Sequence, residues 1–452
     1  MRCEDKKYIT KQRSPRERVP WDQFRDSLSS RQFRRMFRME KSCFEELCNV
    51  IIDEVGEKEF KSQLYINTVL NVPQEQVTTP RLKRMRSMYH AQRATSGGYI
   101  CGEVKVAITL RLLSGGSYLD LAALYNVGYS HIYEIFHHCI SEWTCRDEVI
   151  KFPGIDYLED YNAMQRTAEL FRTSGCHGGI LNGCFGALDG WIVKIRCPRE
   201  SDGVGGTDGF YCRKGFYGIN VHQAIVDKNK LIIWRAIQCR GSEHDSKAFK
   251  KSDMYKKLQE VAGNLLAKGF YFMGDSAYSI RSYLLVPFDN AGIQSAQDAF
   301  NYHLSTCRIW VECAFGEIDM RWGILWKHLP FSLHRNVKVI DATMRLHNFI
   351  VAYRMKNHVD LSTSEVRDYQ DDNENFLRNN HGEIVGVVTG NDGTQIGEWG
   401  RLPRDEEDSK REGKQLRQLL SDNLRRNNCR RPAMSSGATW YRDRFNRTMV
   451  TS

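Results

Sequence analysis

The sequence lacks the patterns that mark several common classes of protein. None of its 14 cysteines lies in a Cys-x-x-Cys pair, and no Cys/His spacing matches a zinc finger. No run of roughly 18 apolar residues is present, so no membrane-spanning helix is predicted. The charged segment from Met1 to Arg18 has no apolar centre, which argues against a secretory signal. Cysteines such as Cys184, Cys239 and Cys313 stand in apolar runs, so we expect reduced, buried thiols in an intracellular protein.

Length and positive charge are what the sequence does have. Its 452 residues suffice for one large domain or for two to three smaller ones, and 41% of them are hydrophobic. The net charge is +10 and the pI is about 8.9. This excess suits a polyanionic partner such as nucleic acid, although many mildly basic proteins bind none.

The pattern along the chain predicts four regions. Residues 1–30 are basic and polar and are expected to be disordered. Residues 31–145 are predicted to be helical, with an insertion at 57–97 whose basic run 81–86 either contacts phosphates or is a solvated face. Residues 180–355 form an α/β domain. Residues 358–452 form a mostly disordered, charged tail that contains one amphipathic helix, marked by Leu416, Leu419, Leu420 and Leu424.

The helical region contains a helix-turn-helix pattern. A helix ends at Ser114-Gly115-Gly116, Ser117 caps a short helix over 119–125, and a turn at 126–128 leads to a further helix that Ser130 is expected to cap. In DNA-binding proteins the second helix of such a unit enters the major groove. Tyr129, His131 and Glu134 are predicted to be exposed there. The alternative is a plain helical hairpin that packs on a core.

The pattern changes to strands after residue 183. Strands are predicted over 185–195, 219–226, 231–237 and 270–273, with a turn at 227–230 and helices over 246–266 and 306–325. This order describes an α/β layer with a mixed sheet.

Four acidic residues stand where acids are not expected. Asp189 interrupts the apolar run 185–193, and Asp275 follows the predicted strand 270–273, at the strand end where α/β sheets place their sites. Asp245 opens a helix. Glu312 lies at the edge of a buried helical stripe, one turn after Arg308.

Carboxylates that converge in this way can hold divalent cations, because Mg²⁺ prefers hard oxygen ligands. Two such ions can activate a water and stabilise the leaving oxygen of a phosphodiester. Each acid also has a simpler interpretation. Asp245 can be a helix cap, Glu312 can pair with Arg308, and Asp189 and Asp275 can be ordinary ion-pair partners. The nearby segment 211–217 combines cations with aromatic residues, which suits phosphate contact and base stacking; the alternative is a surface loop with a partly buried aromatic.

An ordered set of motifs resembles the PIF/Harbinger transposases and their domesticated nuclease relatives. The set comprises Leu188-Asp189-Gly190, Arg213-Lys214-Gly215-Phe216-Tyr217, Gly241-Ser242-Glu243-His244-Asp245-Ser246, Gly274-Asp275-Ser276-Ala277-Tyr278, Arg308-Ile309-Trp310-Val311-Glu312-Cys313-Ala314-Phe315-Gly316 and Arg345-Leu346-His347-Asn348-Phe349-Ile350. Residues 112–121 resemble the helix-turn-helix region of the same family. The likeness covers about 33–56 and 100–355.

The resemblance implies an RNase H-like fold with a DDE metal site. It implies that Asp189, Asp245, Asp275 and Glu312 bind Mg²⁺ or Mn²⁺, with Asp189, Asp275 and Glu312 catalytic and Asp245 an additional ligand or orienting residue. The family usually has Thr-His after the first Asp-Gly, whereas Trp191-Ile192 follow here. The loop 200–210 is also long and rich in glycine.

The expected function is therefore metal-dependent cleavage of DNA, followed in an active transposase by attack of the freed 3′-OH on target DNA. The alternatives are a domesticated, catalytically silent DNA-binding or scaffold protein and an RNA-directed nuclease with the same ligands. The resemblance further implies a separate Myb-like DNA-binding partner and a nuclear location, and it allows a homo-oligomer.

Overall fold

The computed structural model describes residues 20–55, 100–145, 152–174, 178–225, 229–292, 294–357 and 405–431. The predicted insertion 57–97 with its basic run, residues 1–19, and most of the predicted tail lie outside these ranges. Among the described helices, none is both long and apolar enough to cross a membrane. The described cysteines are free thiols, and most are buried, Cys184 among them; Cys313 is partly exposed.

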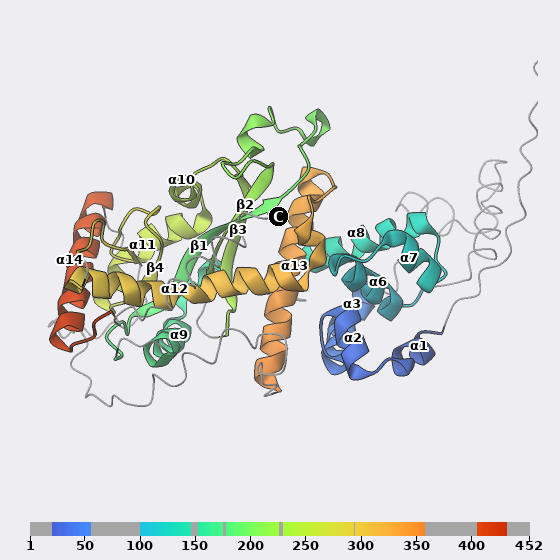
Figure 1. Cartoon of the computed structure of the whole chain (residues 1–452), viewed down its shortest axis with the longest axis horizontal. Helices are drawn as coiled ribbons and strands as arrows, with labels where there is room; N and C mark the ends of the chain where they lie inside the picture. The colour runs from blue at the N-terminus through green and yellow to red at the C-terminus, as the bar shows by residue number, and fades with distance from the viewer. Residues whose placement is uncertain are drawn as a thin grey trace, which may run out of the picture.

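A mixed five-stranded sheet forms the centre of the α/β part (Figure 1). Its strands are β1 (Cys184–Lys194), β2 (Gly218–Ile225), β3 (Ile232–Arg240), β4 (Tyr271–Met273) and β5 (Leu284–Leu285), in the order β3-β2-β1-β4-β5. β1 pairs antiparallel with β2 and parallel with β4. The predicted α/β class with a mixed sheet is confirmed. β5 was not predicted because two residues are too short to show a periodicity.

Helices cover both faces of this sheet. Side chains alternate along β1, so Ala187 and Val193 face one core cluster with α12 (Ala296–Arg321) and α13 (Leu333–Lys356). Leu188 faces the other cluster, with α11 (Asp253–Ala267). In Figure 1 the long helix α12 runs along the sheet towards α13. The remaining elements on these faces are η3 (Gly154–Glu159), α9 (Tyr161–Ser174), α10 (Asp245–Lys250) and η6 (Gly323–Trp326).

Two of the predicted core helices differ from those observed. The single helix expected over 246–266 is divided into α10 and α11, because Ser252 accepts a hydrogen bond from the Tyr255 amide and starts a new helix. The helix expected from 306 begins ten residues earlier, at Ala296, where Ser295 is the N-cap. Glu312 therefore lies in the middle of a long helix, well away from the fraying ends.

The N-terminal part is helical, as expected from about residue 31, but the order begins earlier. Its helices are α1 (Trp21–Ser27), α2 (Ser30–Phe37), α3 (Lys41–Val55), α6 (Gly102–Leu113), α7 (Tyr118–Leu124) and α8 (Tyr129–Cys145). The disorder predicted for residues 1–30 is wrong for 20–30. Trp21 is buried, and its ring packs against those of Phe24, Phe37 and Phe44, which anchors α1.

The turns on either side of α7 agree with the predicted helix ends at some residues and differ at one. Gly115 has a positive φ of 91° after α6, and Ser117 caps α7. Ser130 is inside α8 and does not cap it, because the Gly128 carbonyl accepts the first bond, from the His131 amide. Tyr129 and Glu134 are exposed and His131 is half-buried. The inner face of α8 packs in the core that also contains α13.

The tail contains α14 (Glu406–Arg426), which docks on the core (Figure 1). The helix predicted from the leucines is confirmed and is longer than they indicate. Leu420 and Leu424 are buried against residues of α12, β4 and β5. Docking therefore joins the tail to the end of the sheet that carries β4 and β5.

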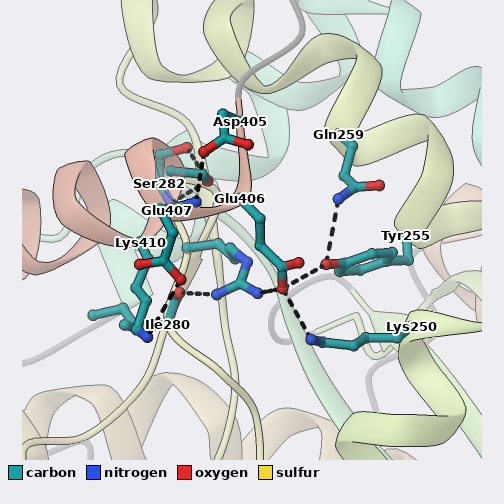
Figure 2. Close-up of polar contacts among 11 residues, drawn as sticks. Lys250, Tyr255, Gln259, Ile280, Ser282, Asp405, Glu406, Glu407 and Lys410 are labelled. Carbon is teal, nitrogen blue, oxygen red and sulfur yellow. Dashed lines mark hydrogen bonds and ion pairs between the residues drawn. The ribbon is translucent and has the colours of Figure 1, made fainter.

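One polar cluster holds the start of α14, and Figure 2 shows it. The Glu406 carboxylate accepts hydrogen bonds from the buried Arg281, from Lys250 at 2.9 Å and from the Tyr255 hydroxyl at 3.4 Å. Next to it, the Ser282 amide donates to Ser409 at 3.2 Å. We call Glu406, Arg281, Lys250 and Tyr255 the Glu406 cluster.

Candidate active site

The pairing of β1 with β4 places two of the predicted acids side by side. The two strands are parallel, and Ala187 is in register with Met273. Asp189 lies two residues beyond that pair on β1, Asp275 lies two residues beyond it after the end of β4, and the charge of Asp275 acts on Asp189. The Asp275 Oδ1 atom accepts a hydrogen bond from the Ala277 amide at 2.9 Å, which fixes the turn after β4.

Helix α12 adds Glu312 and Arg308 to this face. The Arg308 Nη2 atom donates to Asp189 Oδ2 at 2.8 Å and lies 3.6 Å from Glu312 Oε1. The side chains of Arg308 and Asp189 are 15% and 17% exposed, whereas Glu312 is 39% exposed. The same helix buries Val311, Ala314, Phe315 and Ile318, as the predicted stripe requires. We call Asp189, Asp275, Glu312 and Arg308 the acid site.

Electrostatics show that the three carboxylates of the acid site interact. Burial raises the pKa of Asp189 to about 6, Arg308 and the Gly190 amide oppose this rise, and the charges of Asp275 and Glu312 add to it. Burial also raises the pKa of Glu312; Arg308 lowers it and Asp275 raises it further. Negative charge is therefore held at this site at a cost, which is the usual condition of a site that binds a cation or transfers a proton.

Asp245 lies apart from the other three acids. Its Oδ1 atom would be only 2.7 Å from a Cβ atom at Gly190, so its carboxylate fills the space beside that glycine. Because neighbouring residues of a strand point to opposite faces, Gly190 faces away from the side chain of Asp189. The structure thus brings Asp189, Asp275 and Glu312 together and puts Asp245 against the back of β1.

Asn220 on β2 is a site residue that the sequence analysis missed. It is fully buried, and its Nδ2 atom donates to Asp245 Oδ1 at 2.8 Å, while its Oδ1 atom has no hydrogen-bond partner. A side-chain amide within the apolar run Ile219-Asn220-Val221 was the available signal, since buried amides need partners. Asn220 and Asp245 thus bond each other and together fill the space beside Gly190.

Tyr278 lies close to both groups of acids. Its ring packs against Gly274, where an added Cβ would be 3.0 Å from it, and against Phe249. Burial raises the pKa of Tyr278 well above its usual value, and the charges of Asp189, Asp245 and Asp275 raise it further. The hydroxyl therefore stays protonated, and the ring holds the turn that carries Asp275.

The connection from β1 to β2 carries cations and aromatic residues. Arg213, Lys214 and Tyr211 are exposed and Cys212 is buried, so the segment is a surface loop pinned at one residue. Its short helices are η4 (Glu200–Asp202) and η5 (Asp208–Phe210). Trp191, at the position where the family usually has Thr, packs on Phe315 of α12 with ring centroids 5.5 Å apart. Trp191 is thus a wall of the acid site.

The acid site has the donor atoms for a divalent cation. Its carboxylates are hard oxygen ligands, and one positive group, the Arg308 guanidinium, already lies between Asp189 and Glu312. In the described parts of the chain, no three Asp, Glu, His or Cys side chains lie close enough to hold a metal ion as they stand. The residues fit such an ion chemically, provided that the guanidinium and the carboxylates rearrange.

An α/β sheet that presents carboxylates from two parallel strands and a covering helix defines a candidate metal-dependent enzyme. Comparison with known families agrees with this class: residues 188–348 match the family model described as DDE superfamily endonuclease. The matched region begins one residue before Asp189 and contains all four predicted acids. The match supports the superfamily of transposase-derived nucleases. No curated protein and no solved structure matches the chain.

Proposed function

We propose that this protein is a divalent-metal-dependent DNA endonuclease of the transposase type, with an RNase H-like core similar to that of the PIF/Harbinger group. The observation that carries the proposal is the electrostatic interaction of Asp189 with Asp275 and Glu312, with Arg308 between Asp189 and Glu312, within the segment that matches the endonuclease family. The reaction is hydrolysis of a phosphodiester bond, and in a transposase the freed 3′-OH then attacks target DNA.

Each residue of the site has a distinct role in this proposal. Asp189 and Asp275 bind Mg²⁺ or Mn²⁺, and the more exposed Glu312 completes the ligand set. When bound, the cation supplies activation of water and stabilisation of the leaving oxygen. Asp245, which the resemblance implies as an additional ligand or orienting residue, bonds Asn220 and packs beside Gly190 of β1. In this proposal Asp245 is a positioning residue for β1 and not a metal ligand.

The exposed cations of the β1–β2 connection are placed to hold DNA beside the acids. Lys194, at the end of β1, comes five positions after Asp189, which corresponds to about 16 Å of extended chain. Arg213 and Lys214 in the connection can therefore contact phosphates a few base pairs from the scissile bond. Such contacts give weak, salt-dependent binding, so a separate Myb-like protein that selects the sequence in the nucleus fits this proposal.

The test is cleavage of supercoiled plasmid by the purified full chain in Mg²⁺ and in Mn²⁺, with EDTA as the control. Matched DNA and RNA duplexes, run in parallel, establish which nucleic acid is the substrate. We expect metal-dependent nicking of DNA. Cleavage that persists in EDTA would refute the metal-dependent mechanism. DNA binding without cleavage in either metal would favour the silent, domesticated alternative.

A further inference from the structure

Among the residues that the structure describes, Arg308 is the only arginine or lysine with a recorded ion pair to a carboxylate of the acid site. Its Nη2 atom lies on Asp189 Oδ2, and the other oxygen of that carboxylate, Oδ1, accepts from the Gly190 amide at 2.8 Å. Both oxygens of Asp189 are therefore engaged. A cation that binds Oδ2 has to approach the oxygen beside which the guanidinium now lies, and the Gly190 amide already occupies one side of Oδ1.

The contact of Arg308 is also suited to release. Only Nη2 is recorded in the contact with Asp189, and the buried Nε atom has no hydrogen-bond partner. A bidentate pair would use two parallel N–H groups and hold the guanidinium more firmly. Glu312, one helical turn further along α12, gives the guanidinium a second carboxylate to move towards.

We infer that Arg308 is a built-in counter-ion that holds the carboxylates together without metal and competes with a divalent cation for Asp189. Two positive charges cannot share one carboxylate oxygen at close range without strong repulsion. Binding of the cation therefore moves the guanidinium away from Asp189. The released group points from the same helix face as Glu312, where a DNA phosphate is a good acceptor for arginine. This inference rests on the proposed function, because it concerns the metal of that same site.

The experiment compares Mn²⁺ affinity of the full-length wild-type chain with that of Arg308→Gln, without nucleic acid, by titration calorimetry and by electron paramagnetic resonance of free Mn²⁺. Arg308→Lys keeps the positive charge but replaces the planar guanidinium with a shorter, flexible ammonium side chain, so it tests a weakened contact with Asp189. The matched control is Arg172→Gln, which removes an arginine that pairs with Glu169 on helix α9, outside the acid site. Circular dichroism checks the fold of each variant.

We expect Arg308→Gln to bind Mn²⁺ roughly fivefold to a hundredfold more tightly, the range usual for coupling between two ligands. Arg308→Lys should lie between it and the wild type, and Arg172→Gln should match the wild type. Without metal, Arg308→Gln should melt at a lower temperature and gain more from Mn²⁺ than the wild type does. A merely structural arginine would not raise metal affinity when it is removed.

The outcomes separate the two proposals. If the wild type binds Mn²⁺ and Arg308→Gln binds it equally or more weakly, the competition is refuted and the nuclease proposal stands. If Arg308→Gln does not fold, an unchanged affinity in Arg308→Lys refutes the competition and a tighter one supports it. If neither the wild type nor any variant binds Mn²⁺, both proposals fall.

Discussion

Two charged clusters on the same core differ in their balance of charge. In the Glu406 cluster one carboxylate accepts hydrogen bonds from two cations and a tyrosine hydroxyl. In the acid site one guanidinium contacts two carboxylates, those of Asp189 and Glu312, and the charge of Asp275 acts on both of them. The first cluster satisfies its acid within the chain. The second has more carboxylates than recorded positive partners, so it is the cluster to which the proposed function assigns a cation.

The pKa shifts of the two clusters point the same way. Hydrogen bonds from Lys250, and then the charges of Arg281 and Lys250, lower the pKa of Glu406 in spite of some burial. The pKa of Asp189 is raised, mainly by burial, although an arginine is in contact with it. A carboxylate whose ionised form is stabilised supports folding, whereas one whose ionised form is destabilised lowers stability and is typical of a functional site.

The largest expected difference between the clusters is in catalysis. Asp275→Asn keeps the size of the side chain but removes the charge that holds a cation, so the cleavage rate should fall on the order of a thousandfold or more. Glu406→Gln should cleave at close to the wild-type rate, because its contacts join α14 to the core. Single-turnover nicking in Mn²⁺ gives the rates, and fluorescence anisotropy checks that both variants still bind DNA. An Asp275→Asn protein as fast as the wild type would sink the assignment.

The second difference is in stability, and it has opposite signs. Glu406→Gln leaves the buried Arg281 with a weaker partner, so the free energy of unfolding should fall by about 1–3 kcal/mol. Asp189→Asn removes a carboxylate whose pKa is raised to about 6 from 3.8, so the metal-free protein should gain about 1–3 kcal/mol at pH 7. Urea unfolding in EDTA measures both.

The neighbouring Glu407 provides the control for that experiment. It is exposed, and its ion pair with Lys410 is 3.8 Å long at the surface. Glu407→Gln should change stability by less than about 0.5 kcal/mol. The comparison fails if Asp189→Asn destabilises the metal-free protein as much as Glu406→Gln does.

Local sequence signals were clearer for the individual acids than for their surroundings. Asp189 and Asp275 stood out because a charge beside an apolar strand is unusual, and that signal is local. Their alignment depends on the parallel pairing of β1 with β4, which joins segments more than 80 residues apart and has no local signature. The pairing of Arg308 with Asp189 is likewise non-local, whereas its spacing from Glu312 on one helix was readable.

The same distinction explains the errors at the level of the fold. The leucines of α14 predicted a helix, but nothing near them indicates that Glu406 meets Arg281, because that contact depends on tertiary packing. Trp21 was assigned to a disordered segment because its neighbours are polar, and the rings that bury it lie further along the chain. Local periodicity specifies elements, and packing decides which of them dock.

Lowering the pH should abolish the stability differences of Asp189→Asn and Glu406→Gln from the wild type, and it should do so in separate pH ranges. The cost of ionised Asp189 is fully present above about pH 6 and is lost as the pH falls from about 6 towards 3.8, so wild type and Asp189→Asn should converge there. The pKa of Glu406 is lowered from 4.5, so its contribution is present above pH 4.5 and is lost only below it. Urea unfolding at pH 7 and pH 5 measures this. Only for Asp189→Asn should the difference in free energy of unfolding from the wild type be smaller at pH 5 than at pH 7. If the stability differences of Asp189→Asn and Glu406→Gln from the wild type shrink equally, the proposed difference between the two clusters is contradicted.

Salt should produce the smallest difference, and it tests how deeply each cluster is buried. Glu406 and Lys250 are each 44% exposed, so added ions reach their pair. The difference in free energy of unfolding between wild type and Glu406→Gln should therefore shrink between 0.1 and 1 M NaCl. The decrease should be a few tenths of a kcal/mol, on the order of what exposed pairs contribute. Asp189 and Arg308 are mostly buried, so the gap for Asp189→Asn should change less. Sodium sulfate at matched ionic strength checks for ion-specific effects. The opposite result is that salt changes the unfolding free energy difference for Asp189→Asn more than the one for Glu406→Gln. The acid site would then be more open to solvent than its contacts indicate. Ordinary ions would screen its surplus charge, and it would need no bound divalent cation.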